Sequence, residues 1–223
     1  MILAISLITI SAFLYSLTNI VDKVNITNHI TRPIILFILA NTFIPVIGLC
    51  FLPWAENISL VHAFVILLTV IFEIIAVLFY LTSIKKEEPS RVIPLFSFIT
   101  VFVTLFGAFF LGEIFKPVVY VGIILVVIGS WVITSRKNIL SPFKSHALGL
   151  MLLASLFWAS KFVIDKYLLE YYEVITILGY RFIIYVIPVI ILFFVYKKDV
   201  ANFWRQKKKY VMIQWINETV AIG

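Results

Sequence analysis

Two glutamates lie inside long apolar stretches of this chain, where a carboxyl group is costly to place. Glu73 is eleven or twelve residues from either end of the apolar run 61–84, and Glu218 lies in the last apolar run. An ionised carboxylate in hydrocarbon costs at least about 2.5 kcal/mol, so we expect each to face a bundle interior or a water-filled cavity. There it could bind and release a proton or contact a solute. The alternative is a neutral or paired carboxyl that only ties helices together.

One arginine, Arg181, also falls inside an apolar run, about a third of the way along residues 174–196. Its guanidinium could bind an anionic group of a substrate. An ion pair with a glutamate, or a side chain that extends to the membrane surface, would explain this arginine equally well.

Polar residues recur along one face of two predicted helices. The spacings i, i+3 or i+4, and i+7 place side chains on the same side of an α-helix. We expect both faces to line a cavity, although hydrogen bonding between helices, worth about 0.6 to 2 kcal/mol per contact, is an equal alternative. Because Asp22 and Asp165 stand beside lysines near helix ends, interfacial ion pairs are the simpler expectation for those residues. The two stripes are Tyr15, Asn19 and Asp22, and Trp158, Lys161 and Asp165.

Three prolines lie inside or near the start of apolar runs. Proline lacks the amide hydrogen, and its ring clashes with the preceding turn, so it kinks a helix. Pro45, Pro94 and Pro188 are therefore candidate hinges. Prolines are tolerated in many membrane helices, so a simple kink is the alternative.

The composition excludes a soluble domain. Hydrophobic residues make up 63% of the 223 positions and charged residues 13%, and the mean hydropathy is +1.12. Soluble domains have about 45–50% apolar and about 25% charged residues, so this chain lacks the polar surface to cover a water-facing core. The net charge of +7 does not indicate nucleic-acid binding, because the basic residues lie between apolar runs.

The sequence holds no motif for chemistry on a substrate. The single cysteine excludes a disulfide scaffold, and the three histidines are scattered, without an H-E-x-x-H motif or a cysteine cluster. No G-x-S-x-G turn and no Walker loop occurs. We therefore expect no catalytic residue, no metal, no cofactor and no ATP-driven transport by this chain.

Eight apolar runs are long enough to cross a bilayer. A membrane helix needs about 20 mostly apolar residues, because each adds about 1.5 Å and the hydrocarbon layer is about 30 Å thick. Alternating strand patterns do not occur in the sequence, so we predict an all-α polytopic membrane protein. The predicted spans are 1–21, 33–53, 61–84, 92–111, 117–135, 147–169, 174–196 and 210 to the chain end.

The basic residues predict the orientation of the bundle. Of 18 lysines and arginines, fourteen lie in the loops after the first, third, fifth and seventh spans. Three, Lys116, Lys161 and Lys166, lie toward the opposite side. Because basic residues concentrate in cytoplasmic loops, we expect the N-terminus outside, in a multi-pass protein of the cell membrane.

The sequence also contains an internal repeat. An offset of 143 residues superposes Ile-Pro-Val-Ile at 44–47 on the same four residues at 187–190. When the offset is lengthened by two residues, Glu73 superposes on Glu218. One copy holds five spans, and an odd number makes the second copy enter the membrane the opposite way round, as in inverted-repeat transporters. We predict a first repeat over 1–138 and a partial second repeat over 147–223, so that about eight of ten expected spans are present.

Several motifs resemble one family of membrane carriers. The run 158–166 has the form W-x-S-x-F-x-x-x-K, the segment 89–94 is followed by Gly112-Glu113, and glycines stand at 122 and 129. In order and spacing these resemble helices of the EamA-type members of the drug/metabolite transporter superfamily. The resemblance implies a ten-helix carrier of small metabolites, commonly an exporter, with a central cavity. Many relatives have both ends in the cytoplasm, whereas the charge count here favours an external N-terminus.

We therefore predict a secondary transporter that exports small metabolites or drugs by alternating access. A flippase for a lipid-linked substrate, an intramembrane enzyme and a non-transporting fragment stay open as alternatives. The expected partners are the lipid bilayer and a small-molecule substrate, with protons as candidate coupling ions, a homodimer or a missing C-terminal segment as further candidates, and no nucleic acid. The predicted site residues are Glu73, Glu218, Tyr15, Asn19, Trp158, Lys161 and Arg181.

Overall fold

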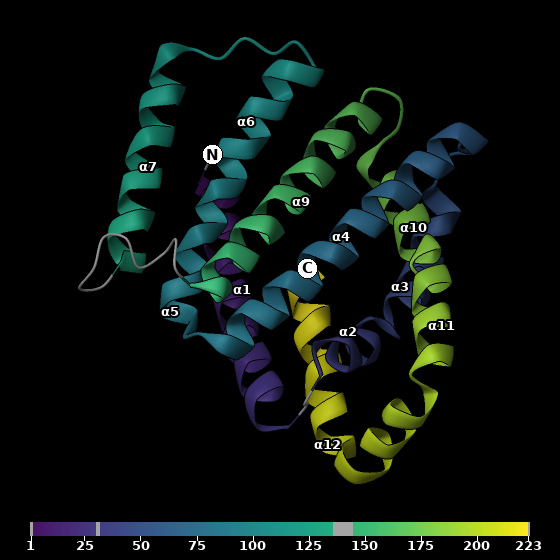
Figure 1. The fold of residues 1–223 in the computed structure, drawn as a ribbon. Coiled ribbons are helices and arrows are strands. Elements are labelled where there is room, and N and C mark those ends of the chain that lie inside the picture. Colours follow the sequence, from purple (N-terminus) through teal and green to yellow (C-terminus); the bar gives the residue numbers. More distant parts are fainter. Residues whose placement is uncertain (1, 30–31, 136–144, 223) are drawn as a thin grey trace.

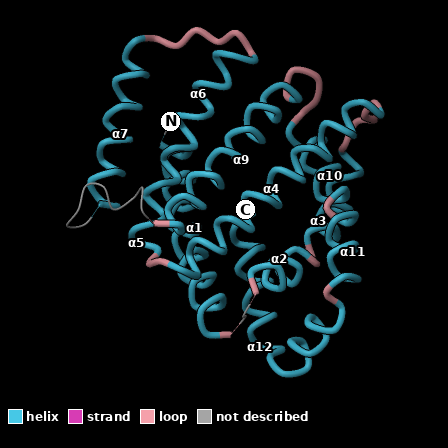
Figure 2. Tube along the Cα trace, viewed as in Figure 1, coloured by secondary structure: helices cyan, strands magenta, loops and turns pink. Residues whose placement is uncertain are grey.

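Helices make up almost the whole of the described chain. The computed structural model describes the backbone of residues 2–29, 32–135 and 145–222, with side chains throughout except at 2–5, 7–8, 11–12, 206–208 and 217–222. Within these ranges the chain holds no strand, which confirms the all-α prediction (Figure 1, Figure 2). The elements are α1 Ile2–Asn28, α2 Pro33–Asn41, α3 Ile44–Phe51, η1 Leu52–Trp54, α4 Leu60–Lys86, α5 Pro89–Val92, η2 Ile93–Ser97, α6 Phe98–Phe110, α7 Pro117–Ser135, α9 His146–Leu168, α10 Val174–Ile184, α11 Val186–Val195 and α12 Lys197–Ile222.

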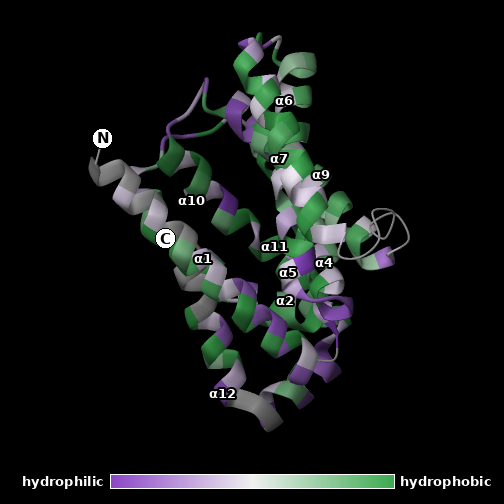
Figure 3. Ribbon diagram, turned by 90° about the vertical axis from the view of Figure 1, so that its left-hand side faces the viewer, coloured by the Kyte–Doolittle hydropathy of each residue, from purple (hydrophilic) through white to green (hydrophobic). Residues whose placement is uncertain are grey.

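Six helical stretches of the described residues are long and apolar enough to cross a membrane. They coincide with the second to the seventh predicted spans. Helices α1 and α12 also cover the first and last predicted spans, but the count of eight stays a prediction. Figure 3 shows hydrophobic residues over the long helices and hydrophilic residues mainly at helix ends and in loops. The six stretches are Pro33–Trp54, Leu60–Lys86, Pro89–Phe110, Pro117–Ser135, His146–Leu168 and Val174–Val195.

Three of these spans are interrupted near the predicted prolines. Helix α2 ends at Asn41, and α3 begins at Ile44, one residue before Pro45. Pro94 lies in the 3-10 helix η2 between α5 and α6. Helix α11 begins two residues before Pro188. Because proline cannot donate the helical hydrogen bond, interruptions are expected at these positions, and a role as hinges stays a prediction.

The last helix begins earlier than predicted. The sequence predicts a loop over 197–209 and a span from Tyr210, whereas α12 begins at Lys197. The loop prediction is wrong because lysine, arginine and glutamine favour helix, and Asp199 in the first turn complements the positive helix N-terminus. Asp199 also pairs with Arg32 at the start of α2, with Arg32 Nη1 and Asp199 Oδ2 2.6 Å apart.

The long helices α4 and α9 form the centre of the bundle and pack against each other along their lengths (Figure 1). Helix α6 lies along α9, and α1 packs against α12. Helix α7 stands at the edge, where it contacts mainly η2 and α5 through the hydroxyl pair Ser97 and Ser130 and a hydrogen bond from Thr134 to the Arg91 carbonyl. The largest cluster of buried apolar side chains draws on α2, α4, α9, α10, α11 and α12. The interior therefore joins elements from both predicted repeats.

Helices α3 and α10 approach closely at two glycines. A Cβ built on Gly48 would lie 2.7 Å from the Cβ of Phe182 and 3.0 Å from the backbone nitrogen of Ile183. One built on Gly179 would lie 3.2 Å from the Cβ of Phe51. Small residues let backbones approach each other in lipid, where van der Waals packing drives helix association. The glycines thus hold the second and seventh spans together.

Candidate functional site

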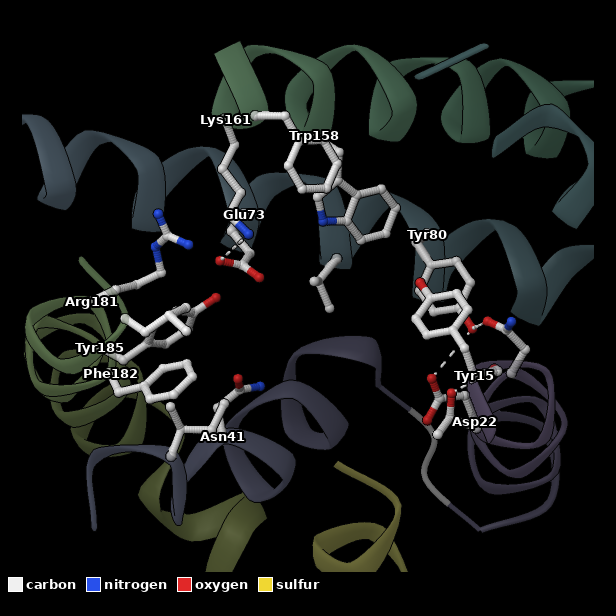
Figure 4. Close-up of a pocket in the computed structure, with 16 residues that line it drawn as sticks. Tyr15, Asp22, Asn41, Glu73, Tyr80, Trp158, Lys161, Arg181, Phe182 and Tyr185 are labelled. Carbon is white, nitrogen blue, oxygen red and sulfur yellow. Dashed lines mark hydrogen bonds and ion pairs between the residues drawn. The ribbon is translucent and has the colours of Figure 1, made fainter. Parts of the chain in front are cut away.

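A cavity of about 360 Å³ lies among α1, α2, α3, α4, α9 and α10 (Figure 4). Its walls come from helices that lie far apart in the sequence. Six of the seven predicted site residues line it. The side chain of the seventh, Glu218, lies outside the described residues, although its backbone belongs to α12. The six are Tyr15, Asn19, Glu73, Trp158, Lys161 and Arg181.

A pair of opposite charges lies at one end of the cavity. Glu73 projects from α4 toward Lys161 on α9, and Lys161 Nζ lies 3.3 Å from Glu73 Oε2. The Glu73 side chain is 22% exposed and that of Lys161 is 11% exposed. Glu73 Oε2 is buried and accepts no hydrogen bond from any described residue. The structure thus brings together two residues that the sequence predicts separately.

Arg181 lies beside this pair, and its side chain is only 6% exposed. Its Nη2 donates a hydrogen bond to Asp165 Oδ1 on α9, and the two groups form an ion pair. The ion-pair explanation for Arg181 therefore holds, with an aspartate in place of the expected glutamate. Arg181 Nε is buried and has no hydrogen-bond partner within the described part of the chain. One donor and one acceptor of opposite charge thus remain unsatisfied at the same end of the cavity.

The opposite end of the cavity is a hydrogen-bonded network on α1. Tyr80 on α4 donates through its hydroxyl to Asn19 Oδ1 at 2.7 Å and also contacts Asp22 Oδ2 at 3.3 Å. Gln214 on α12 donates to Asp22 Oδ1 at 2.9 Å and accepts from Asn25 Nδ2 at 2.6 Å. The polar stripe on α1 therefore faces the cavity, and it also makes hydrogen bonds to other helices. Lining a cavity and joining helices, the two alternatives for this stripe, each describe part of its contacts.

Aromatic rings separate the two polar ends. The Trp158 ring lies 5.9 Å from the Tyr80 ring and 5.1 Å from that of Phe96, measured between centroids. The Tyr15 ring lies 6.4 Å from Phe96. Figure 4 shows Trp158 between the charged residues and Tyr80 with Asp22. The middle of the cavity can therefore hold an apolar or ring-shaped group.

Ion pairs are expected at two helix ends; at one end they form with other partners, and at the other end the lysine donates to backbone carbonyls instead. Asp165 pairs with Arg181, and Lys166 pairs with Glu113 in the connection between α6 and α7. Lys23 donates to the backbone carbonyls of Ile84 and Glu87. Adjacent residues on a helix point in different directions, so neighbours in sequence are poor partners for each other.

Sequence reasoning missed four residues that belong to this site or support it. Three of them carried a usable signal: Tyr80 lies seven residues after Glu73, Gln214 lies four residues before Glu218, and Tyr185 lies four residues after Arg181, so each shares a helix face with a predicted residue. The fourth, Asn41, gave no signal, because its helix carries no polar stripe. The four are Tyr80, Gln214, Asn41 and Tyr185.

The fold and the cavity define an integral, multi-pass helical membrane protein with a polar internal site. The sequence model of the EamA-like transporter family matches residues 2–135 and 146–215. The chain belongs to the EamA-like transporter family, and is thus a membrane transporter of the drug/metabolite transporter superfamily. The family consists of transporters rather than enzymes. None of the curated proteins and none of the solved structures compared with the chain matches it.

Proposed function

We propose that this chain is a secondary transporter that exports small molecules with charged groups by alternating access. The proposal rests on two buried atoms that have no hydrogen-bond partner among the described residues, Glu73 Oε2 and Arg181 Nε. Both belong to residues that line one cavity between membrane spans. Buried polar atoms are nearly always hydrogen-bonded, so exceptions in a cavity indicate where a ligand binds. Glu73 is then the first residue expected to contact the transported molecule or its coupling proton.

The size and walls of the cavity limit the ligand. A volume of about 360 Å³ lies at the lower end of the range for small-molecule sites, roughly 300 to 1,000 Å³. The aromatic rings of Trp158, Phe162 and Phe182 contribute to its walls. A small molecule with a charged end and an apolar or aromatic body therefore fits best.

Packing between spans supports an inverted duplication over 1–138 and 147–223. In the predicted repeat, α1 corresponds to α9, α4 to α12, and the span of α2 and α3 to the span of α10 and α11. The contact between α4 and α9 therefore corresponds to the contact between α12 and α1, and both pairs of helices pack together. In the same way, the contact between α3 and α10 corresponds to that between α11 and α2. The first of these pairs packs tightly through Gly48, whereas the second is in much less extensive contact. We interpret the structure as one of two alternating states of the transporter, in which the cavity is closed on the side where α3 meets α10.

Flux through proteoliposomes tests the proposal. Labelled benzylamine, benzoate and phenylalanine supply a cation, an anion and a zwitterion, each with one aromatic ring. We expect Glu73→Gln to lower the initial rate of uptake of the transported probe at least about tenfold. Glu170→Gln removes the same charge from an exposed loop and should leave the rate unchanged.

The outcomes separate the possible functions. Equal rates in the two variants would contradict the role of Glu73. Conversion of a probe without its accumulation would indicate an enzyme. A chain that neither converts nor accumulates any of the probes would argue against transport of this class of molecule.

A further inference from the structure

The Glu73–Lys161 pair differs from the other ion pairs of the described residues. In this pair the charges lie 3.3 Å apart, and Glu73 Oε2 accepts no hydrogen bond. A charged pair gains much of its strength from a short, aligned hydrogen bond, so this contact lacks a contribution that the other pairs have. The pairs that do contain a hydrogen bond are Arg181–Asp165, Arg91–Glu87, Arg32–Asp199 and Lys166–Glu113.

The Lys161 ammonium makes a second contact besides that with Glu73. Its Nζ lies 5.2 Å from the centroid of the Phe162 ring, within the range of a cation–π contact. Phe162 lines the same cavity. A lysine side chain is a flexible four-carbon stem, so the ammonium can move away from Glu73 and still lie against the cavity wall.

We propose that Lys161 is a tethered counter-ion, which neutralises Glu73 in the empty cavity and is displaced when the cationic group of a transported molecule binds Glu73. The inference rests on the proposed function, because it takes Glu73 as the group that contacts the ligand. A buried carboxylate without a counter-ion is costly, and Lys161 removes that cost while no ligand is bound. Lys161 therefore competes with the cationic group of the ligand for Glu73.

Displacement also specifies the rest of the ligand. Once Lys161 leaves Glu73, its ammonium and the Nε of Arg181 both need an acceptor at that end of the cavity (Figure 4). A ligand that carries an anion as well as a cation supplies one. Because such a zwitterion has no net charge, it exchanges partners without changing the charge of the cavity. The preferred substrate class is therefore a small zwitterion.

Other titratable groups share the cavity or its wall, and any pH dependence has to be assigned among them. They come from α1, α4, α9, α10 and the residue between α10 and α11. A substitution of Lys161 changes the competition at Glu73 while leaving these groups in place. The groups are Tyr15 and Asp22 on α1, Tyr80 on α4, Asp165 on α9, Arg181 on α10 and Tyr185 between α10 and α11.

Binding to the purified protein in detergent micelles tests the proposal. Benzylamine, a cation at neutral pH, and benzoate are titrated calorimetrically into the wild type, Lys161→Gln and Lys161→Arg. We expect Lys161→Gln to bind benzylamine at least about tenfold more tightly and benzoate more weakly, whereas Lys161→Arg stays within about threefold of the wild type. Lys166→Gln, the same change at an exposed lysine of α9, should have no effect.

A second readout distinguishes competition from a purely structural role. A purely structural loss would weaken the binding of benzylamine and of benzoate alike, whereas competition strengthens the first and weakens the second. If the glutamine variant does not fold, Lys161→Met keeps the unbranched stem and removes the same charge. Benzylamine affinity equal to that of the wild type in the folded, uncharged variant would overturn the proposal. Because this assay measures binding alone, a failure of flux would refute transport, whereas the competition between Lys161 and a bound cation is decided by the measured affinities.

Discussion

Gly48 is a position where a single methyl group should be hard to accommodate. The added Cβ would lie 2.7 Å from the Cβ of Phe182, 3.0 Å from the nitrogen of Ile183 and 3.1 Å from the carbonyl oxygen of Gly179. Two of these three atoms are backbone, so rotating a side chain cannot relieve the contact, and α3 has to move away from α10. Overpacking of this kind costs about 1 to 3 kcal/mol.

Gly149 in α9 supplies the matched control, because a Cβ there meets no atom within 4 Å. Both substitutions gain the same helix propensity of alanine, so their difference isolates the clash. A chain of this size loses about 2 to 4 °C of Tm per kcal/mol, so Gly48→Ala should unfold about 2 to 12 °C below Gly149→Ala. Thermal unfolding in detergent, followed by circular dichroism, measures both. Equal Tm values for the two variants would refute the close packing of α3 on α10.

Two further changes test the charged site and the start of α4. Asp165→Asn leaves the buried Arg181 guanidinium without its counter-ion and should destabilise the chain by about 3 to 5 kcal/mol. Adding Arg181→Gln to this variant should recover part of the lost stability. A double-mutant cycle measures the coupling energy between the two residues. An additive double variant would contradict the ion pair. Ser59→Ala removes the hydroxyl that caps α4 by accepting from the His62 backbone nitrogen and should cost about 0.5 to 2 kcal/mol, whereas Ser59→Asn should retain most of the stability in the same thermal assay.

Apolar length predicted most of the fold. In lipid every backbone polar group must be satisfied within the segment, so about 20 apolar residues are enough to specify a helix, and six spans follow the predicted runs. The same reasoning failed at α12, whose first turns are basic and polar. Such a segment carries no apolar signal, and its helix follows from local propensity and the contact of Asp199 with Arg32.

Helical periodicity predicted which side chains reach the cavity but could not predict their partners. Tyr15 and Asn19 share one face of α1, and Trp158 and Lys161 share one face of α9, and all four line the cavity. The choice of Lys161 as the partner of Glu73 depends on how α4 and α9 lie against each other. That relation is a property of tertiary packing, which a single-helix pattern does not contain.

The charged end of the cavity is costly for a membrane protein to keep. Replacing a buried ion pair by apolar residues of similar volume is often neutral or stabilising, so stability alone does not explain Glu73, Lys161, Asp165 and Arg181 in this position. The described part of the chain leaves two buried side-chain atoms without hydrogen bonds, one an acceptor on Glu73 and the other a donor on Arg181. Both belong to residues that line the same ligand-sized cavity. A molecule that donates a hydrogen bond to the first atom and accepts one from the second would satisfy both at once. Binding such a molecule removes the free-energy cost of leaving these atoms without hydrogen bonds, and this gain favours the bound state.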